Sequence, residues 1–276
     1  MTRNRLNRLL TLLLCALLLA AFFIWKKEND KPLNISEAEI VFCQTEDDAN
    51  CAILLMDEYC IMIDTGEKKD ADHIISVLED RGVKKINCMF LTHPDKDHIG
   101  AASSIMEAFT VDDVVVPFFD GEKKKYDELL TYMNQKQIKK TTVSVKTERY
   151  FGDLSFEINP PKELSYEKSN DYSLAIVVNH GKNHMLFPGD AQKERLKELR
   201  ELDFSKVNLM VLPHHGRGEG SSVKLLKDVE PDLVIVTAKE PGIELSEALD
   251  KMDISWLSSL DGDICLISRG KGYEIK

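Results

Sequence analysis

The chain has 276 residues, of which 43% are hydrophobic and 30% charged, with only 9 prolines and 14 glycines. This composition is typical of a globular protein and excludes the disordered and collagen-like classes. All 47 acidic residues but only 31 of the 36 basic residues follow position 27, so that this part carries a formal charge of −16 and does not favour broad binding to nucleic acid or anionic lipid.

The N-terminal segment differs in composition from the rest of the chain. Residues 9–25 form an uncharged, leucine-rich run of 17 residues, and three arginines precede it. As a helix this run would span roughly 25 Å, near the lower limit for crossing a bilayer. We predict an uncleaved membrane anchor at residues 1–27, and the arginines favour an extracytoplasmic body. A cleaved signal peptide is the alternative, although residues 22–25 (FFIW) lack the small side chains of a cleavage site.

A short polar linker, residues 28–36, precedes a single predicted domain at residues 37–276. Short apolar runs bounded by turn residues alternate with amphipathic segments throughout this domain. This pattern predicts an α/β fold with two mixed sheets packed face to face and helices outside. The predicted strands are 38–43, 51–56, 59–64, 86–90, 112–119, 141–147, 154–160, 173–180, 184–189, 207–213, 232–238 and 263–270; the predicted helices are 70–82, 100–109, 126–138, 191–202, 221–229 and 246–252.

The stretch FLTHPDKDHIG, residues 90–100, places four metal-competent side chains directly after an apolar strand. His93 and Asp95 can face one ion, and Asp97 and His98 can turn toward a second. Aspartates that converge without a cation would repel one another and lose hydration, at a cost of several kcal/mol. The stretch therefore predicts a metal site, and a polar turn is the alternative.

Other polar groups follow predicted strands farther along the chain. Asp190 follows the run MLFPG, and the pair His214–His215 follows NLMVLP. Loops at strand ends commonly carry chemistry on a rigid scaffold. Asp190 is the predicted bridging carboxylate, and His215 is predicted to complete the second site. Two ions about 3.5–4 Å apart can hold a bridging hydroxide that attacks an ester or phosphodiester bond.

The stretch THPDKDHIG resembles the H-x-H-x-D-H signature of metallo-β-lactamase-fold hydrolases, with Asp95 in place of the second histidine. Together with NDYSLAIVV, MLFPGD and LMVLPHHG, it is similar to the hydrolase domain of ComEC-type competence proteins. The teichoic-acid phosphorylcholine esterases share the aspartate. The resemblance covers residues 37–270 and implies the metallo-β-lactamase αββα sandwich.

The resemblance also implies roles for residues around the metals. Asp64 matches the aspartate that holds a ligand histidine by its far ring nitrogen, and a turn-forming role is its alternative. The histidine that the family places before the strand SLAIVV is absent, and Asn170, Asp171 or a water is expected there. Asp97 and His214 are the predicted catalytic residues, with His214 contacting substrate or protonating a leaving group. The roles of His214 and His215 could be exchanged.

The resemblance implies two divalent ions, with Zn²⁺ as the first choice and Mn²⁺ as the second, because Asp95 makes its site richer in oxygen. It also implies a phosphodiesterase or nuclease of ComEC-like type that acts on an anionic substrate. The charge of −16 disfavours nucleic acid and leaves an envelope phosphodiester or ester as the alternative. A non-catalytic metal-stabilised binding module is a further alternative.

Two features receive simpler interpretations. The run of lysines at 123–125 is predicted to be a charged helix face, with a phosphate-binding rim as the alternative. His180 and His184 flank the turn signal GKN and are predicted to face solvent.

Overall fold

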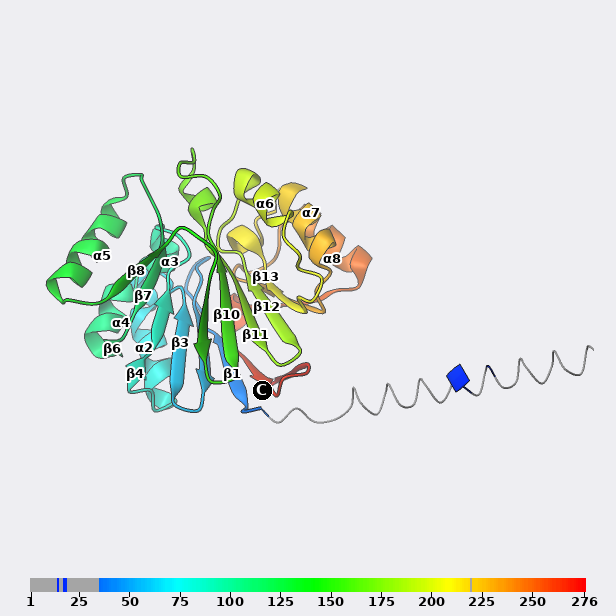
Figure 1. Cartoon of the computed structure of the whole chain (residues 1–276), viewed down its shortest axis with the longest axis horizontal. Coiled ribbons are helices and arrows are strands. Elements are labelled where there is room, and N and C mark those ends of the chain that lie inside the picture. Colours follow the sequence, from blue (N-terminus) through cyan, green and yellow to red (C-terminus); the bar gives the residue numbers. More distant parts are fainter. Residues whose placement is uncertain (1–13, 15–16, 19–34, 219) are drawn as a thin grey trace, which may run out of the picture. The chain divides into compact units, whose positions relative to one another are not determined.

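Two β-sheets pack face to face in the computed structural model, which describes residues 14, 17–18, 35–218 and 220–276 (Figure 1). The first sheet has the strand order β17-β16-β1-β2-β3-β5-β7-β8, and the second has the order β15-β14-β13-β12-β11-β10-β9. Strands β4 and β6 form a separate parallel pair. Residues 35–276 make one compact unit.

The strands have the following bounds: β1 Ala38–Phe42, β2 Ala52–Met56, β3 Tyr59–Ile63, β4 Lys85–Ile86, β5 Cys88–Phe90, β6 Thr110–Val111, β7 Val114–Pro117, β8 Lys140–Val143, β9 Thr147–Phe151, β10 Leu154–Asn159, β11 Ala175–His180, β12 Asn183–Phe187, β13 Leu209–Val211, β14 Leu233–Val236, β15 Ser255–Ser258, β16 Ile264–Ser268 and β17 Tyr273–Ile275.

The helices are α2 Ala71–Asp80, α3 Lys96–Ile99, α4 Ala102–Ala108, α5 Lys124–Gln135, α6 Lys193–Leu199, α7 Gly220–Val229 and α8 Ile243–Met252, with 3₁₀ turns η1 Lys68–Asp70, η2 Ser169–Tyr172, η3 Pro213–Gly216 and η4 Ser259–Asp261.

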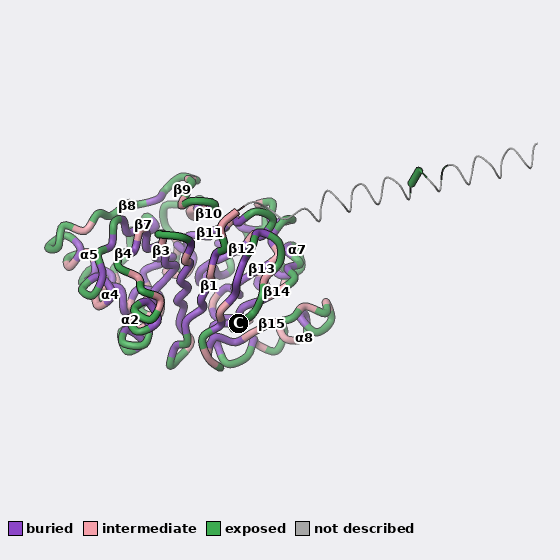
Figure 2. The backbone as a smooth tube through the Cα atoms, turned by 90° about the horizontal axis from the view of Figure 1, so that it is seen from below, coloured by how far each residue is buried: buried purple, intermediate pink, exposed green. Residues whose placement is uncertain are grey.

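Alternation along each strand divides the apolar side chains between the two faces of a sheet. In β1, Ile40 and Phe42 enter the core between the sheets, while Val41 faces the helices outside. The Phe42 ring stacks on Phe187 across the sandwich, with centroids 5.9 Å apart. Figure 2 shows the central strands of both sheets mostly buried, with the exposed residues on helices, loops and edge strands such as β9.

Helices cover the outer face of each sheet. Helices α2, α4 and α5 pack on the first sheet, and α6, α7 and α8 pack on the second. The architecture is therefore the αββα sandwich that the sequence predicts.

Several segments differ from their predicted form. Residues 86–90 are divided between β4 and β5, which belong to different sheets, and β15 and β17 lie where no strand is predicted. Residues 141–147 are not one strand, because β8 joins the first sheet and β9 the second. The helix predicted to begin at residue 100 is preceded by the short helix α3, so Asp97 and His98 lie on a helical turn. Secondary-structure propensity alone does not reveal these breaks, because they depend on which sheet each half of the segment joins or on the loop that it forms.

The predicted membrane anchor falls on residues 1–27, almost all of which lie outside the described residues, and the division into anchor, linker and domain stays a prediction. In the part of the chain that the structure describes, no helix combines the length and apolar character needed to span a bilayer.

Candidate metal centre

The candidate site lies where both sheets end their strands at the same edge of the sandwich. In the first sheet, β3 and β5 are parallel and lead into Asp64 and the His93 loop. In the second sheet, β12, β13 and β14 are parallel and lead into Asp190, the His214–His215 pair and Thr237. Because the parallel strands end at the same edge, side chains from segments far apart in sequence meet there. In open α/β sheets, bound molecules are found outside the carboxyl ends of the strands.

Four of the predicted ligands form one compact group. One ligand atom from each of Asp97, His98, Asp190 and His215 lies within 4.8 Å of the others. His215 Nε2 is 3.0 Å from Asp97 Oδ2 and 3.3 Å from Asp190 Oδ2. His98 Nε2 and Asp190 Oδ1 face each other at 3.0 Å without the alignment of a hydrogen bond.

His93 adjoins this group, whereas Asp95 is directed partly elsewhere. His93 Nε2 is 3.8 Å from Asp190 Oδ2, and its ring lies against His98 with centroids 3.9 Å apart. The Asp95 carboxylate contacts Lys123 Nζ at 2.9 Å and accepts a hydrogen bond from Ser169 Oγ at 3.0 Å. Asp95 is thus the one predicted ligand in the His93–His98 stretch whose recorded contacts are to residues outside the ligand set.

Three imidazoles are anchored through Nδ1. Asp64 Oδ2 lies 2.7 Å from His98 Nδ1, and Thr92 Oγ1 donates to the same carboxylate oxygen at 2.8 Å. Because the Thr92 proton is used on Asp64, the Thr92 oxygen is left to accept from His93 Nδ1 at 3.3 Å. His215 Nδ1 lies 3.0 Å from Thr237 Oγ1. Such anchoring fixes the ring orientation and points each Nε2 at the site.

The donor set fits a divalent cation. His93 Nε2, His98 Nε2 and Asp190 Oδ1 are buried, and none has a hydrogen-bond partner among the described residues. Buried polar atoms are normally hydrogen-bonded, because leaving one unpaired costs about 1–3 kcal/mol. Imidazole nitrogens and carboxylate oxygens that converge in this way are suitable ligands for Zn²⁺ and for Mn²⁺.

The charges of the group depend strongly on one another. Burial would raise the pKa of Asp190, but the charges of His98 and His215 hold it well below its ordinary value. Burial would likewise lower the pKa of His98, which its carboxylate neighbours Asp190 and Asp64 nevertheless raise. Burial, helped by the charge of His98, lowers the pKa of His93 to about 4. His93 is therefore neutral at pH 7, whereas His98 and His215, whose pKa values the neighbouring carboxylates raise, would have to release a proton when a cation binds.

The turn η2 occupies the place where the family histidine is missing. Asn170 Nδ2 donates to Asp190 Oδ2 at 3.3 Å, so this amide contacts the predicted bridging carboxylate. Asp171 points away from the site, since its Oδ1 accepts the backbone N–H groups of Gln192 and Arg195 at the start of α6. Of the two side chains expected at the gap, Asn170 is the one beside the ligands.

His214 and His215 have left-handed backbones, with φ of 51° and 56°. This conformation is uncommon for residues other than glycine, and strain of this kind is concentrated at functional sites. In this conformation the His215 side chain is buried, whereas the His214 side chain is partly exposed. Gln192 Nε2 lies 3.0 Å from His214 Nδ1.

Gly189, which precedes Asp190, permits a close approach of two loops. Its φ is +59°, and a Cβ atom there would lie 2.9 Å from Ser173 Oγ and 3.0 Å from Thr92 Cβ. The Ser173 hydroxyl accepts the Asp190 backbone N–H at 3.1 Å. Glycine therefore lets the Asp190 loop pack directly on the Thr92 and Ser173 segments.

The sequence did not single out several residues that support the ligands. Thr92, Ser173 and Thr237 position candidate ligand residues, and Ser169 contacts Asp95. The only available signal was a hydroxyl residue at a strand end, as in the stretch FLTH. That signal is common in turns and identifies no partner.

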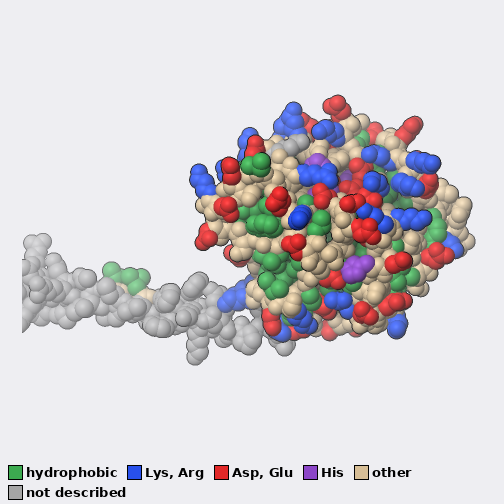
Figure 3. All heavy atoms as spheres, turned by 180° about the vertical axis from the view of Figure 1, so that it is seen from behind, with side chains coloured by type: hydrophobic (Ala, Val, Ile, Leu, Met, Phe, Trp, Pro, Cys, Tyr) green, Lys and Arg blue, Asp and Glu red, His purple; other side chains and the backbone are tan. Residues whose placement is uncertain are grey.

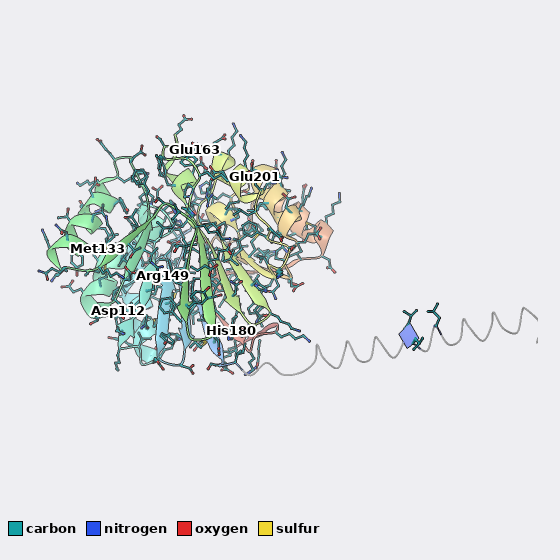
Figure 4. All side chains as sticks on the ribbon, viewed as in Figure 1. Asp112, Met133, Arg149, Glu163, His180 and Glu201 are labelled. Atoms are coloured by element: carbon teal, nitrogen blue, oxygen red, sulfur yellow. The ribbon has the colours of Figure 1, made fainter. Side chains whose placement is uncertain are left out.

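The prediction that His180 faces solvent is wrong. The side chain is fully buried at the end of β11 farther from η2, where Figure 4 labels it. Its Nδ1 lies 2.7 Å from Ser268 Oγ and its Nε2 lies 3.0 Å from the Ser36 carbonyl oxygen. Segments 88 and 144 residues away in sequence bury it, and a local turn signal carries no information about such segments.

Comparisons with known proteins agree with this fold. Residues 45–237 match the family model of the metallo-beta-lactamase superfamily. Recombination protein 2 of Haemophilus influenzae is 27% identical over 165 residues, which is 60% of this chain and 19% of that protein. ComE operon protein 3 of Bacillus subtilis is 24% identical over 166 residues, which is 60% of this chain and 21% of that protein. The matched region thus spans about a fifth of each of these curated relatives.

Solved structures share the fold at low sequence identity. The metallo-beta-lactamase fold protein YhfI from Bacillus subtilis superposes with a TM-score of 0.57 at 10% identity, covering 84% of this chain and 100% of that one. A metal-dependent hydrolase of the beta-lactamase superfamily gives a TM-score of 0.51 at 12% identity, covering 82% of this chain and 98% of that one.

Proposed function

Because the chain belongs to the metallo-β-lactamase superfamily and is thus a metal-dependent hydrolase, we propose that it is a dinuclear phosphodiesterase. The observation that carries this proposal is the group of Asp97, His98, Asp190 and His215 within 4.8 Å, beside His93. His93 and Asp95 would hold one ion, Asp97, His98 and His215 the second, and Asp190 would lie between them. Two divalent cations, when bound, supply Lewis-acid activation of water and charge compensation for a phosphoryl oxygen.

The residues of the chain provide the rest of the chemistry. Burial would raise the pKa of Asp97, but the hydrogen bond from His215 and the charge of His98 lower it, so this carboxylate stays ionised. It is thus able to orient a water molecule by accepting its proton in a hydrogen bond. His214 lies at the partly exposed rim beside Gln192, where an imidazole can protonate a leaving oxygen.

Zn²⁺ is the proposed metal and Mn²⁺ the second choice. The carboxylates Asp95, Asp97 and Asp190 make the donor set richer in oxygen than an all-histidine site, and oxygen-rich sites accept Mn²⁺ more readily. Metal analysis of the purified full chain, with Zn²⁺ or Mn²⁺ added, tests both the identity and the number of the ions. Two equivalents of metal per chain are expected, and a single equivalent would contradict the dinuclear proposal.

The leading substrate class is a phosphodiester. Two relatives are named for recombination and for a competence-type operon, which suggests nucleic acid. The charge of −16 after position 27 favours the second substrate option, a small or envelope-borne phosphodiester or ester, because affinity for nucleic acid comes largely from Lys/Arg–phosphate contacts. A nuclease panel and an envelope-phosphodiester panel assayed side by side separate the two.

The direct test is turnover of bis(p-nitrophenyl) phosphate with Zn²⁺ or Mn²⁺. We expect Asp97→Ala to lower kcat/KM on the order of 100-fold or more, because it removes both a ligand and the water-orienting carboxylate. Asp112→Ala is the matched control, since Asp112, labelled in Figure 4, pairs with Lys85 and precedes β7. It thus lies at the end of the parallel strands β5 and β7 opposite to the candidate ligands. Equal rates for wild type and Asp97→Ala would leave only the binding-module interpretation.

We also propose that residues 1–27 anchor the protein in a membrane with the catalytic domain outside the cytoplasm. The support is the uncharged run 9–25 and the arginines before it. We expect the protein to sediment with membranes after a carbonate wash. We also expect protease added from the outer side to digest the domain. Release by carbonate would rule out the anchor, and protection from external protease would reverse the proposed orientation.

A further inference from the structure

Four lysines gather beside the candidate metal centre although the chain is acidic overall. A hollow of about 330 Å³ is lined by Asp95 and Asp97 together with Lys96, Lys123, Lys124 and Lys125. Figure 3, which views the molecule from behind, shows acidic and basic side chains intermixed on that face, without a large patch of one sign. The four lysines around this hollow are a local concentration of ammonium groups in a chain that is acidic overall.

This lysine rim, defined here as Lys96 and Lys123–Lys125, is in direct contact with the metal-binding loop. Lys123 Nζ lies 2.9 Å from Asp95 Oδ1. An anionic group next to a substrate bond held at the candidate ligands would therefore be within reach of these ammonium groups.

The hollow continues along α5. A second hollow of about 470 Å³ shares Lys96 and Lys125 with the first and runs between α4 and α5, where Ser103 and Ser104 also line it. The two hollows are therefore adjacent, and Glu67, Glu107 and Glu128 also line the second one.

Three lysines of the rim form ion pairs with two glutamates. Glu128 is shared by Lys125 at 2.9 Å and Lys124 at 4.0 Å, and Glu67 contacts Lys96 at 2.6 Å. The side chains of Lys96, Lys124 and Lys125 are 67%, 87% and 64% exposed. The pairs of Lys124 and Lys125 with Glu128, whose side chain is 49% exposed, contribute only about 0–1 kcal/mol, so a phosphate can displace Glu128 at low cost.

We infer that the lysine rim is a subsite for a phosphate group one linkage away from the bond that is cleaved. This inference rests on the proposed phosphodiesterase function and deepens it by naming what the substrate carries beside the scissile bond. The ligand chemistry is a phosphate dianion or diester, and its source is either a nucleotide strand or a polyol phosphate.

Two chromogenic substrates that differ by a single phosphate test the inference. They are thymidine 5′-(p-nitrophenyl phosphate) and the same compound with a 3′-phosphate, assayed with the full chain and Zn²⁺ or Mn²⁺. For wild type we expect a KM about 5–10-fold lower for the 3′-phosphorylated substrate and a similar kcat, as a few exposed charge pairs would give. The difference should shrink with added NaCl, because salt screens exposed charges.

The variant is Lys124→Gln/Lys125→Gln, which leaves Asp95 and its contact with Lys123 in place. It should abolish the preference without changing kinetics on the substrate that lacks the 3′-phosphate. Lys85→Gln is the matched control, because Lys85 is 46% exposed and pairs with Asp112 at 2.8 Å. Lys85 precedes β5, whereas the candidate ligands His93–His98 follow it. A preference that is absent in wild type, or that persists in the double variant, overturns the inference.

A binding measurement keeps the two proposals separate. If neither substrate is cleaved, the proposed function fails, and calorimetric titration with thymidine 3′,5′-bisphosphate still tests the rim. Weaker binding to the double variant than to wild type supports the inference, and equal binding overturns it. Competition by a thymidylate trinucleotide and by a glycerol-phosphate trimer then identifies the source, and inhibition by neither contradicts the rim.

Discussion

The His98 Nδ1 atom lies 2.7 Å from Asp64 Oδ2, and both residues are buried. Asp64 directly follows β3 and also accepts the backbone N–H and the hydroxyl of Thr92. One carboxylate thus fixes the chain immediately before the His93–His98 stretch and one imidazole within it. The relationship joins two strand ends of the first sheet and sets the direction of a candidate ligand.

Replacing Asp64 by Asn should weaken metal binding by about 10–100-fold, because the amide cannot hold the imidazole as a carboxylate does. Asn also tolerates the left-handed backbone of residue 64, where φ is 60°, so the fold should persist. Metal affinity by competition with a chromogenic chelator measures the effect. Asp112→Asn should bind metal as wild type does, and wild-type affinity in Asp64→Asn would refute the anchoring role.

Chelation should destabilise the protein. A cation that binds only the folded chain adds about 4 kcal/mol at a free concentration 1,000 times its Kd. Thermal unfolding with and without EDTA should show a clear decrease in Tm for wild type. The Asp190→Asn variant should start from a lower Tm in the presence of metal and change less on chelation. A wild-type Tm that is indifferent to EDTA would argue against an occupied site.

Gly189→Ala should destabilise the fold by about 2 kcal/mol and lower metal affinity, since the new Cβ would meet Ser173 and Thr92 in a backbone that disfavours it. Gly82→Ala is the matched control: its φ is +69°, but nothing lies within 4 Å of the added atom. That variant should cost about 1 kcal/mol and leave metal binding unchanged. Urea unfolding compares the two, and equal losses would show that the close packing at Gly189 is unimportant.

Stability should fall as the pH decreases through the titration range of His180. Burial lowers the pKa of this residue in the folded state. Above its unfolded pKa of about 6.5 neither state is protonated; below it the unfolded chain binds a proton that the folded chain resists, so the free energy of unfolding decreases.

Urea unfolding between pH 8 and pH 5 measures this dependence. The His180→Gln variant should be less stable at pH 8, because it changes buried hydrogen bonds, but its stability should fall less steeply toward pH 5. His73→Gln, at a residue whose side chain is 43% exposed, is the control. An unchanged slope in His180→Gln would mean that other groups cause the acid dependence.

Much of the fold could be predicted from local patterns, and so could the strand ends at which the candidate ligands meet. Alternating apolar residues in runs such as 38–43 and 173–180 define strands with one face toward the core, because side chains on a strand alternate. Polar residues directly after such runs, as at His93, Asp190 and His215, identified the edge where chemistry was expected.

Only the tertiary structure decided which partners these residues have. The assignment of Asn170 to the ligand cluster and of Asp171 to the start of α6, the contact of Lys123 with Asp95 and the burial of His180 all depend on pairs of segments far apart in the chain. The physical reason is that a sequence pattern specifies the face of an element, whereas the angle of a side chain and its neighbours are set when two sheets and their loops pack together.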